Sequence, residues 1–191
     1  MNRICFATNN SHKLDEVRAI LSGNLELMSL NELNFTEEIP EPYETIEENA
    51  LAKAQFVFDN LHIPVLADDS GLEIEALGGK PGVHSAHYSG TRDNKANIDL
   101  VLKEMEGQKN RQARFKSVMA FIDLDGKPQA FEGIVEGEIA VNIKGEQGFG
   151  YDPIFIPQGY KQTFAELSPT DKNNISHRKR ALEKWVQSLN A

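Results

Sequence analysis

The stretch most able to do chemistry is PVLADDSG at residues 64–71, where an apolar run of strand length is followed by two adjacent carboxylates. An α/β sheet delivers polar groups to its carboxyl edge in this way, and ligands bind there. Asp68 and Asp69 repel each other unless they are solvated, one is protonated, or a cation lies between them. A hard divalent cation suits two carboxylates. Alternatively, Asp68 ends the strand and Asp69 begins a turn.

A second polar segment lies between a predicted strand at residues 3–8 and a helix whose apolar residues begin at Leu14. Backbone N–H groups at the start of a helix, together with a lysine, are suited to binding phosphate. An ordinary helix cap is the alternative interpretation. The segment consists of Thr8, Asn9, Asn10, Ser11, His12 and Lys13.

Two further charged residues are candidates for the same site. Glu41 lies between two prolines in an acidic stretch, so it is either part of a solvated loop or a pre-set metal or water ligand. Thr45 and Glu48 have capping-box spacing and open a predicted helix. Lys53 borders the apolar stripe of that helix, from which it either reaches solvent or points toward a carboxylate cluster.

The carboxyl-terminal half adds a glycine-rich aromatic loop, GFGYD at residues 148–152. Its glycines allow close backbone approach, and Phe149 and Tyr151 offer flat faces to a nucleobase, although aromatic residues near a strand are often core residues. A last helix is predicted to begin after Ser176. His177 and Arg178 at its start oppose the helix dipole, which indicates binding of an electron-rich or anionic ligand.

One stretch supports a different enzyme class. Residues 121–126, FIDLDG, resemble the nucleophile motif of haloacid-dehalogenase-type phosphatases, with Asp123 as the nucleophile. Asp125-Gly126 between two alternating runs instead predicts a β-hairpin, and Lys127 replaces the expected threonine. The hairpin interpretation explains the same residues and is preferred.

The composition limits the class of protein. A chain of 191 residues can form one domain with a sizeable core. Its net charge of −9 argues against unaided binding to duplex nucleic acid or an anionic membrane. Cys5 is the one cysteine, and no apolar stretch reaches membrane-spanning length. These features predict a cytoplasmic protein in a reducing compartment.

Taken together, the motifs closely resemble the inosine triphosphate pyrophosphatase family over essentially the whole chain. The matching motifs, in order, are ATNNSHK at 7–13, ENALAK at 48–53, ADDSG at 67–71, LGGKPG at 77–82, GFGYDP at 148–153 and SHR at 176–178. The family usually has glycine where this chain has Asn9.

The resemblance implies roles for individual residues. Asp69 would be the base and a magnesium ligand, Glu41 a second ligand, and Lys53 the buried lysine beside the phosphates. The triphosphate would be held by residues 8–13 and Lys172. Base and sugar would be bound by Ser70, Phe149, Gly150, Tyr151, Asp152, His177 and Arg178.

The implied reaction is hydrolysis of inosine, deoxyinosine or xanthosine triphosphate to the monophosphate and pyrophosphate. The implied fold is α/β, a long mixed sheet flanked by helices in two lobes with a cleft, formed by residues 1–191 as a single domain. A homodimer is also implied. A non-catalytic nucleotide sensor with the same pocket is the alternative. The sequence leaves open whether Asp68 or Asp69 is the base, and which residue reads the 2-position of the purine.

Overall fold

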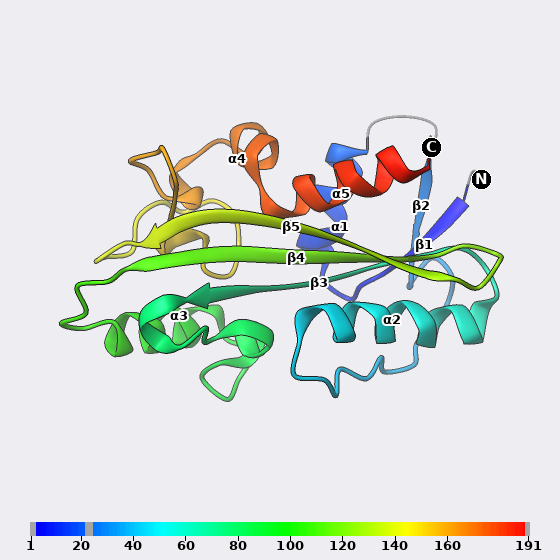
Figure 1. The fold of residues 1–191 in the computed structure, drawn as a ribbon, viewed down its shortest axis with the longest axis horizontal. Helices are drawn as coiled ribbons and strands as arrows, with labels where there is room; N and C mark the ends of the chain where they lie inside the picture. The colour runs from blue at the N-terminus through cyan, green and yellow to red at the C-terminus, as the bar shows by residue number, and fades with distance from the viewer. Residues whose placement is uncertain (1–2, 22–24, 190–191) are drawn as a thin grey trace. The chain divides into compact units, whose positions relative to one another are not determined.

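The computed structural model describes residues 3–21 and 25–189. Its centre is a mixed six-stranded sheet with the strand order β2-β1-β3-β4-β5-β6, which confirms the predicted α/β class (Figure 1). Neighbouring β1 and β2 are parallel, whereas β5 and β6 are antiparallel. The strands are β1 Arg3–Ala7, β2 Glu26–Ser29, β3 Val65–Ile74, β4 Gln112–Ile122, β5 Pro128–Ile139 and β6 Phe155–Pro157.

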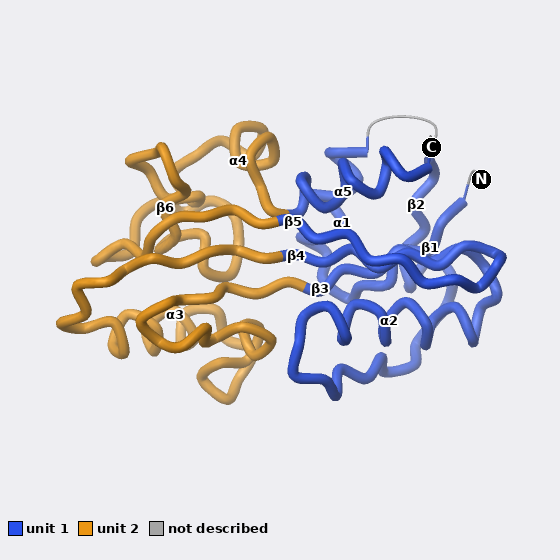
Figure 2. Tube along the Cα trace, viewed as in Figure 1, with its two compact units in different colours: residues 1–69, 117–133, 178–191 blue, residues 70–116, 134–177 orange. Residues whose placement is uncertain are grey.

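The chain divides into two compact units, which are described separately (Figure 2). Unit 1 comprises residues 1–69, 117–133 and 178–191, and unit 2 comprises residues 70–116 and 134–177. Unit 1 contains the helices α1 Ser11–Ile20 and α2 Ile46–Leu61, and all but the first residue of α5 His177–Ser188. Unit 2 contains α3 Asn94–Glu104 and α4 Pro169–Ile175.

In unit 1, local sequence explains where the helices begin. Thr45 caps α2 as predicted, since its hydroxyl accepts a hydrogen bond from the Glu48 N–H at 3.2 Å and donates to Glu48 Oε2 at 2.6 Å. Apolar side chains of α1 and α5 pack with those of the strands into one core cluster. Its buried members are Ile4, Phe6, Val17, Leu27, Leu66, Met119, Phe121, Ala181, Leu182 and Trp185.

Unit 2 has its own core cluster. The helix α4 begins after a capping serine, because the Ser168 hydroxyl accepts from the Asp171 N–H and Pro169 occupies the first turn. The buried core residues are Leu72, Ile74, Ile98, Val101, Met105, Ala113, Phe115, Val135, Ile139, Tyr151, Ile154, Phe155, Phe164 and Leu167.

The predicted strand end at Asp68 is wrong, because β3 continues through both aspartates to Ile74. The strand can continue since β4 remains its neighbour in the sheet. The parallel partner β1, however, pairs with β3 only as far as Ala67. The two carboxylates therefore follow the point where β1 ends and residues 8–13 begin.

Asn9 lies at the position where the family usually has glycine. It is not among the residues with positive φ.

The segment that resembles a phosphatase motif spans the end of β4 and, at residues 123–126, the turn to β5, as the hairpin interpretation predicted. The Asp123 carboxylate accepts a hydrogen bond from the Leu124 N–H at 2.7 Å, and Leu124 is 70% exposed.

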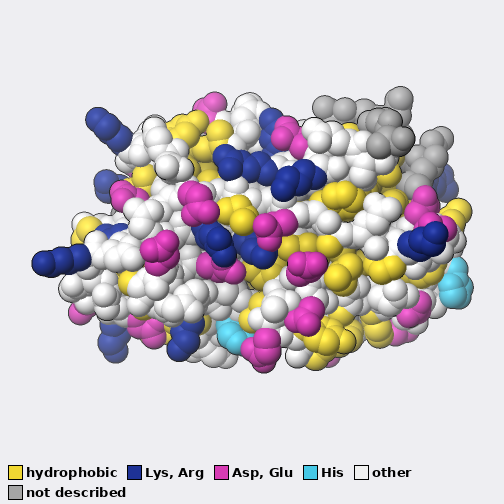
Figure 3. Space-filling view, viewed as in Figure 1, with side chains coloured by type: hydrophobic (Ala, Val, Ile, Leu, Met, Phe, Trp, Pro, Cys, Tyr) yellow, Lys and Arg dark blue, Asp and Glu magenta, His cyan; other side chains and the backbone are white. Residues whose placement is uncertain are grey.

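On the face of the molecule drawn in Figure 3, acidic and basic side chains are interspersed. Within the described ranges, no helix is long and apolar enough to cross a membrane.

Candidate functional site

The ammonium group of Lys53 joins two carboxylates in unit 1. Its Nζ lies 2.8 Å from Asp69 Oδ1 and 2.7 Å from Glu41 Oε1, and the lysine is buried. Lys53 therefore points inward from α2 instead of reaching solvent. Burial lowers the pKa of Lys53, but the two carboxylates outweigh it and leave the pKa raised.

The Asp69 carboxylate is buried beside Lys53. Burial raises its pKa above the ordinary value, and Lys53 and Lys13 offset that effect only in part. A carboxylate with a raised pKa, hydrogen-bonded to a single lysine, is typical of a general base.

Asp68 lies in a different environment, where it accepts bonds from three side chains. Its carboxylate lies 3.1 Å from Lys13 Nζ, 3.0 Å from Arg178 Nη2 and 2.5 Å from Ser117 Oγ. Although burial acts in the opposite direction, Arg178 and Lys13 hold the pKa of Asp68 well below its usual range. Arg178 also bonds to Glu16 of α1. These contacts form a charged cluster of Asp68, Lys13, Arg178 and Glu16.

The segment at residues 8–13 combines a helix cap with a candidate phosphate site. Asn10 caps α1, since its Oδ1 accepts from the Lys13 N–H at 3.3 Å, as the ordinary interpretation proposed. Its own N–H donates to Thr8 Oγ1 at 3.2 Å. Asn9, Ser11 and His12 are exposed. Burial lowers the pKa of Lys13, although the nearby Asp68 carboxylate acts to raise it.

In unit 2, two of the predicted site residues, Phe149 and Lys172, are bonded to Asp152. One carboxylate oxygen, Oδ2, accepts from the Phe149 N–H at 2.8 Å and from Lys172 Nζ at 2.6 Å. Lys172 Nζ also lies 4.8 Å from the centroid of the Phe149 ring. Lys172, which the resemblance assigned to the triphosphate, thus contacts two residues of the predicted base loop.

The remaining predicted residues take different positions. The His177 ring stacks on Phe115 in unit 2, with centroids 4.8 Å apart and planes at 11°. Tyr151 is buried, whereas Ser70 and Gly150 are partly exposed. Gly150 has φ +58°, a conformation that favours glycine.

Sequence reasoning missed Glu16 and Ser117 as partners of these groups. Glu16 lies three residues after Lys13 and so on the same face of α1, which could have revealed it. Ser117 interrupts the alternating apolar residues of β4. A polar residue at an inward strand position requires a buried partner, here Asp68.

Within residues 3–21 and 25–189, no group of three or more His, Cys, Asp or Glu side chains could hold a metal ion on its own. Two carboxylates, Glu41 and Asp69, nevertheless contact the same ammonium group. Because magnesium is commonly held by one or two carboxylates together with substrate phosphate oxygens, this pair fits magnesium.

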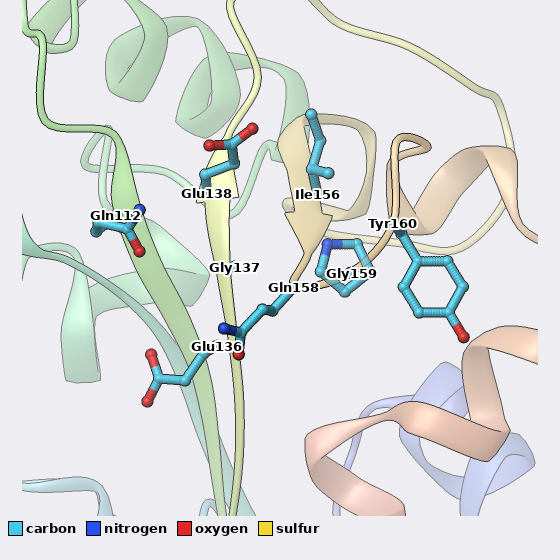
Figure 4. Close-up of a pocket in the computed structure, with 9 residues that line it drawn as sticks. Gln112, Glu136, Gly137, Glu138, Ile156, Gln158, Gly159 and Tyr160 are labelled. Atoms are coloured by element: carbon cyan, nitrogen blue, oxygen red, sulfur yellow. The ribbon is translucent and has the colours of Figure 1, made fainter.

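A hollow of about 390 Å³ on unit 2 is a poor candidate for a nucleotide phosphate (Figure 4). It contains the carboxylates of Glu136 and Glu138, which would repel phosphate. None of the predicted site residues is in its lining, which consists of Gln112, Glu136, Gly137, Glu138, Ile156, Pro157, Gln158, Gly159 and Tyr160.

The amino-acid sequence of this chain is similar to those of known proteins. The chain is 48% identical over 180 residues to a dITP/XTP pyrophosphatase of Porphyromonas gingivalis, covering 93% of this chain and 92% of that protein. It is 46% identical over 195 aligned residues to a dITP/XTP pyrophosphatase of Bacillus subtilis, covering 100% and 98%.

Solved structures agree with the sequence comparison. The Staphylococcus aureus Ham1 protein matches with a TM-score of 0.90 and 37% identity, covering 98% of each chain. A HAM1 protein from Coxiella burnetii matches with a TM-score of 0.90 and 38% identity, covering 100% of this chain and 99% of that one. The Ham1 family model matches residues 4–188, and the chain belongs to the Ham1 family.

Proposed function

We propose that this protein hydrolyses the non-standard purine nucleoside triphosphates ITP, dITP and XTP to the monophosphate and pyrophosphate. The observation that carries the proposal is the bond of Lys53 to both Asp69 and Glu41 in unit 1. Its support is the similarity to proteins named dITP/XTP pyrophosphatase over nearly the whole chain.

Asp69 is the general base in this proposal, and Asp68 is not. Asp69 has a raised pKa, so it can take a proton from the attacking water. Asp68 is engaged by Lys13, Arg178 and Ser117, and its depressed pKa makes it a poor proton acceptor. The attacking water forms a bond to the α-phosphorus, the bond to the bridging oxygen breaks, and pyrophosphate leaves with that oxygen.

Cations of unit 1 stabilise the charge of the leaving group. The ammonium group of Lys53 lies beside the Asp69 carboxylate. Lys13 lies in the first turn of α1, together with the exposed Ser11 and His12. Glu41 and Asp69 would hold magnesium. When bound, the ion would neutralise phosphate charge around the reacting phosphorus.

The nucleobase of the substrate is assigned to unit 2, where it would stack on the ring of Phe149. Lys172 and His177 supply donors that suit the 6-oxo acceptor of hypoxanthine and xanthine, where adenine presents an amino group. Sites that hydrogen-bond a substrate group can reject an analogue lacking it by large factors. Lys172 is therefore assigned to the base loop in place of the triphosphate, on the basis of its contacts with Asp152 and Phe149.

Four further properties belong to the proposal. Residues 1–191 act as one domain, which the family match over residues 4–188 supports. The protein works as a homodimer, as the family resemblance implies, and light scattering after gel filtration would test this. It acts in the cytoplasm, consistent with its buried free thiol. Its partners are nucleotides instead of nucleic acids, consistent with the net charge of −9.

The test is to identify the products formed from ITP with magnesium, with ATP and GTP as comparison substrates. Pyrophosphate from ITP, much less from ATP and GTP, and none after chelation of the metal is the expected result. Orthophosphate that disappears in Asp123→Asn would support the phosphatase alternative. Tight binding of ITP without either product would support the nucleotide sensor.

A further inference from the structure

The loop at residues 148–152 is closed internally by Asp152. Its carboxylate accepts from the Phe149 N–H at 2.8 Å, and the Asp152 N–H donates to the Phe149 carbonyl at 3.2 Å. Gly148 has φ +77°, and a Cβ atom there would lie 2.1 Å from Asp152 Oδ2. These contacts fix the shape of the loop but leave its position relative to β3 to another contact.

That second contact comes from Tyr151. Its side chain is buried in the core cluster of unit 2, with 4% of its surface exposed. The phenolic hydroxyl donates to the Ser85 carbonyl oxygen at 2.9 Å. Tyr151 therefore anchors the loop to the 3₁₀ helix Gly82–His87.

The same serine holds its own segment against β3. Ser85 Oγ accepts from the Leu72 N–H at 2.9 Å and donates to the Gly82 carbonyl at 2.6 Å. A Cβ atom on Gly71 would lie 2.2 Å from the Gly82 oxygen, so the two backbones are in direct contact. Ser85 thus connects the strand just after Ser70 with the loop that carries Phe149.

We propose that Ser85 is a positioning residue for base recognition, which holds the Phe149 loop in register with Ser70 through Tyr151 and Leu72. Ser85 itself touches no substrate. The Tyr151 hydroxyl is a structural donor in this arrangement and not a ligand of the base. The inference rests on the proposed function, which assigns base and sugar to these two segments.

The test compares two ligands that do not require turnover. Binding of inosine monophosphate and of inorganic pyrophosphate, each with magnesium, is measured by calorimetry in the wild type, Ser85→Ala and Tyr151→Phe. We expect each variant to bind the monophosphate about tenfold more weakly. A displaced loop would make about one hydrogen bond fewer to the monophosphate, and one hydrogen bond corresponds to about tenfold in affinity. Pyrophosphate affinity should change less than about twofold.

Tyr88→Phe is the matched control. It removes a tyrosine hydroxyl bond in the same unit, to Glu104 at 2.5 Å, and keeps the bonds of Ser85 to Leu72, Gly82 and Tyr151. The double variant Ser85→Ala/Tyr151→Phe should be no weaker than the poorer single variant, since both act through one chain of contacts. Tyr151→Phe keeps the buried ring, so it can be judged even if Ser85→Ala folds poorly.

Two results would overturn the inference. One is unchanged monophosphate affinity in Tyr151→Phe, or in a folded Ser85→Ala protein. The other is an equal loss of monophosphate and pyrophosphate affinity, which indicates general loss of structure. A wild type that binds the monophosphate but releases no pyrophosphate from ITP refutes the proposed function, while the variants still decide the role of Ser85. A wild type that does not bind the monophosphate refutes the inference, while pyrophosphate release from ITP still decides the proposed function.

Discussion

Asp68 and Asp69 are consecutive residues of β3, yet their carboxylates enter different groups of charged residues. Asp68 bonds to Lys13, Arg178 and Ser117, whereas Asp69 bonds to Lys53. Side chains of neighbouring strand residues point to opposite faces of a sheet, which accounts for the separation. Their pKa values are shifted in opposite directions, so the two acids are suited to different tasks.

Asp69→Asn should slow turnover strongly and keep nucleotide binding. Removing a general base costs about 10²- to 10⁴-fold in rate, while the amide keeps the shape of the side chain. Pyrophosphate release from ITP is the measurement, with ITP affinity determined separately. Asp123→Asn is the control, because Asp123 lies in the turn between β4 and β5, and it should retain full activity. Full activity in Asp69→Asn would exclude Asp69 as the base.

Asp68→Asn should lower stability at neutral pH and flatten its acid dependence. Removing one partner of a buried ion pair costs about 3 kcal/mol of unfolding free energy. The pKa of Asp68 is lower in the folded than in the unfolded state, so the unfolded chain takes up the proton first. Its contribution is fully present above about pH 4, the unfolded pKa, and is lost as the pH falls toward the folded pKa.

Urea unfolding of the wild type and Asp68→Asn between about pH 2 and 7 measures this effect. The difference in unfolding free energy between the two proteins should shrink as the pH falls. A difference that stays constant over that range would show that the Asp68 charge contributes nothing. Ser117→Ala, which removes one donor to Asp68, should show a smaller loss in the same direction.

Lys172→Met should weaken binding of the base more than it slows chemistry. The variant removes the partner of the buried Asp152 carboxylate, which also holds the Phe149 N–H. We expect the KM for ITP to rise about tenfold or more and the preference for ITP over GTP to fall. Lys161→Met, an exposed lysine of the same unit, is the matched control. An unchanged preference in Lys172→Met would remove Lys172 from base recognition.

The thiol of Cys5 should be inert in the folded protein. It is fully buried in β1, and burial raises its pKa to about 12. Thiolate is the reactive form, so a disulfide reagent at pH 8 should label almost none of the native protein. In urea the same reagent should label one thiol per chain. Rapid labelling of the native state would show that β1 opens readily.

The local elements and the residue types of the site can be predicted from the amino-acid sequence. Capping residues such as Thr45 and Ser168 act through neighbours three residues away, so their effect can be read from the chain. The six sequence motifs, in their order along the chain, also indicated the family. The boundary of β3 was predicted wrongly, because continuation past Asp68 depends on hydrogen bonds from another strand.

Which charged residues contact one another depends on how the chain folds. Arg178 and Asp68 are 110 positions apart, and their contact gives the cation at the start of α5 a buried partner that the sequence did not indicate. Lys172 likewise meets Asp152 across 20 positions. A buried charge is stable only beside its partner, and packing brings the partners together. Residue types and spacing therefore predict which groups are available, while the fold assigns each one its partner and its pKa.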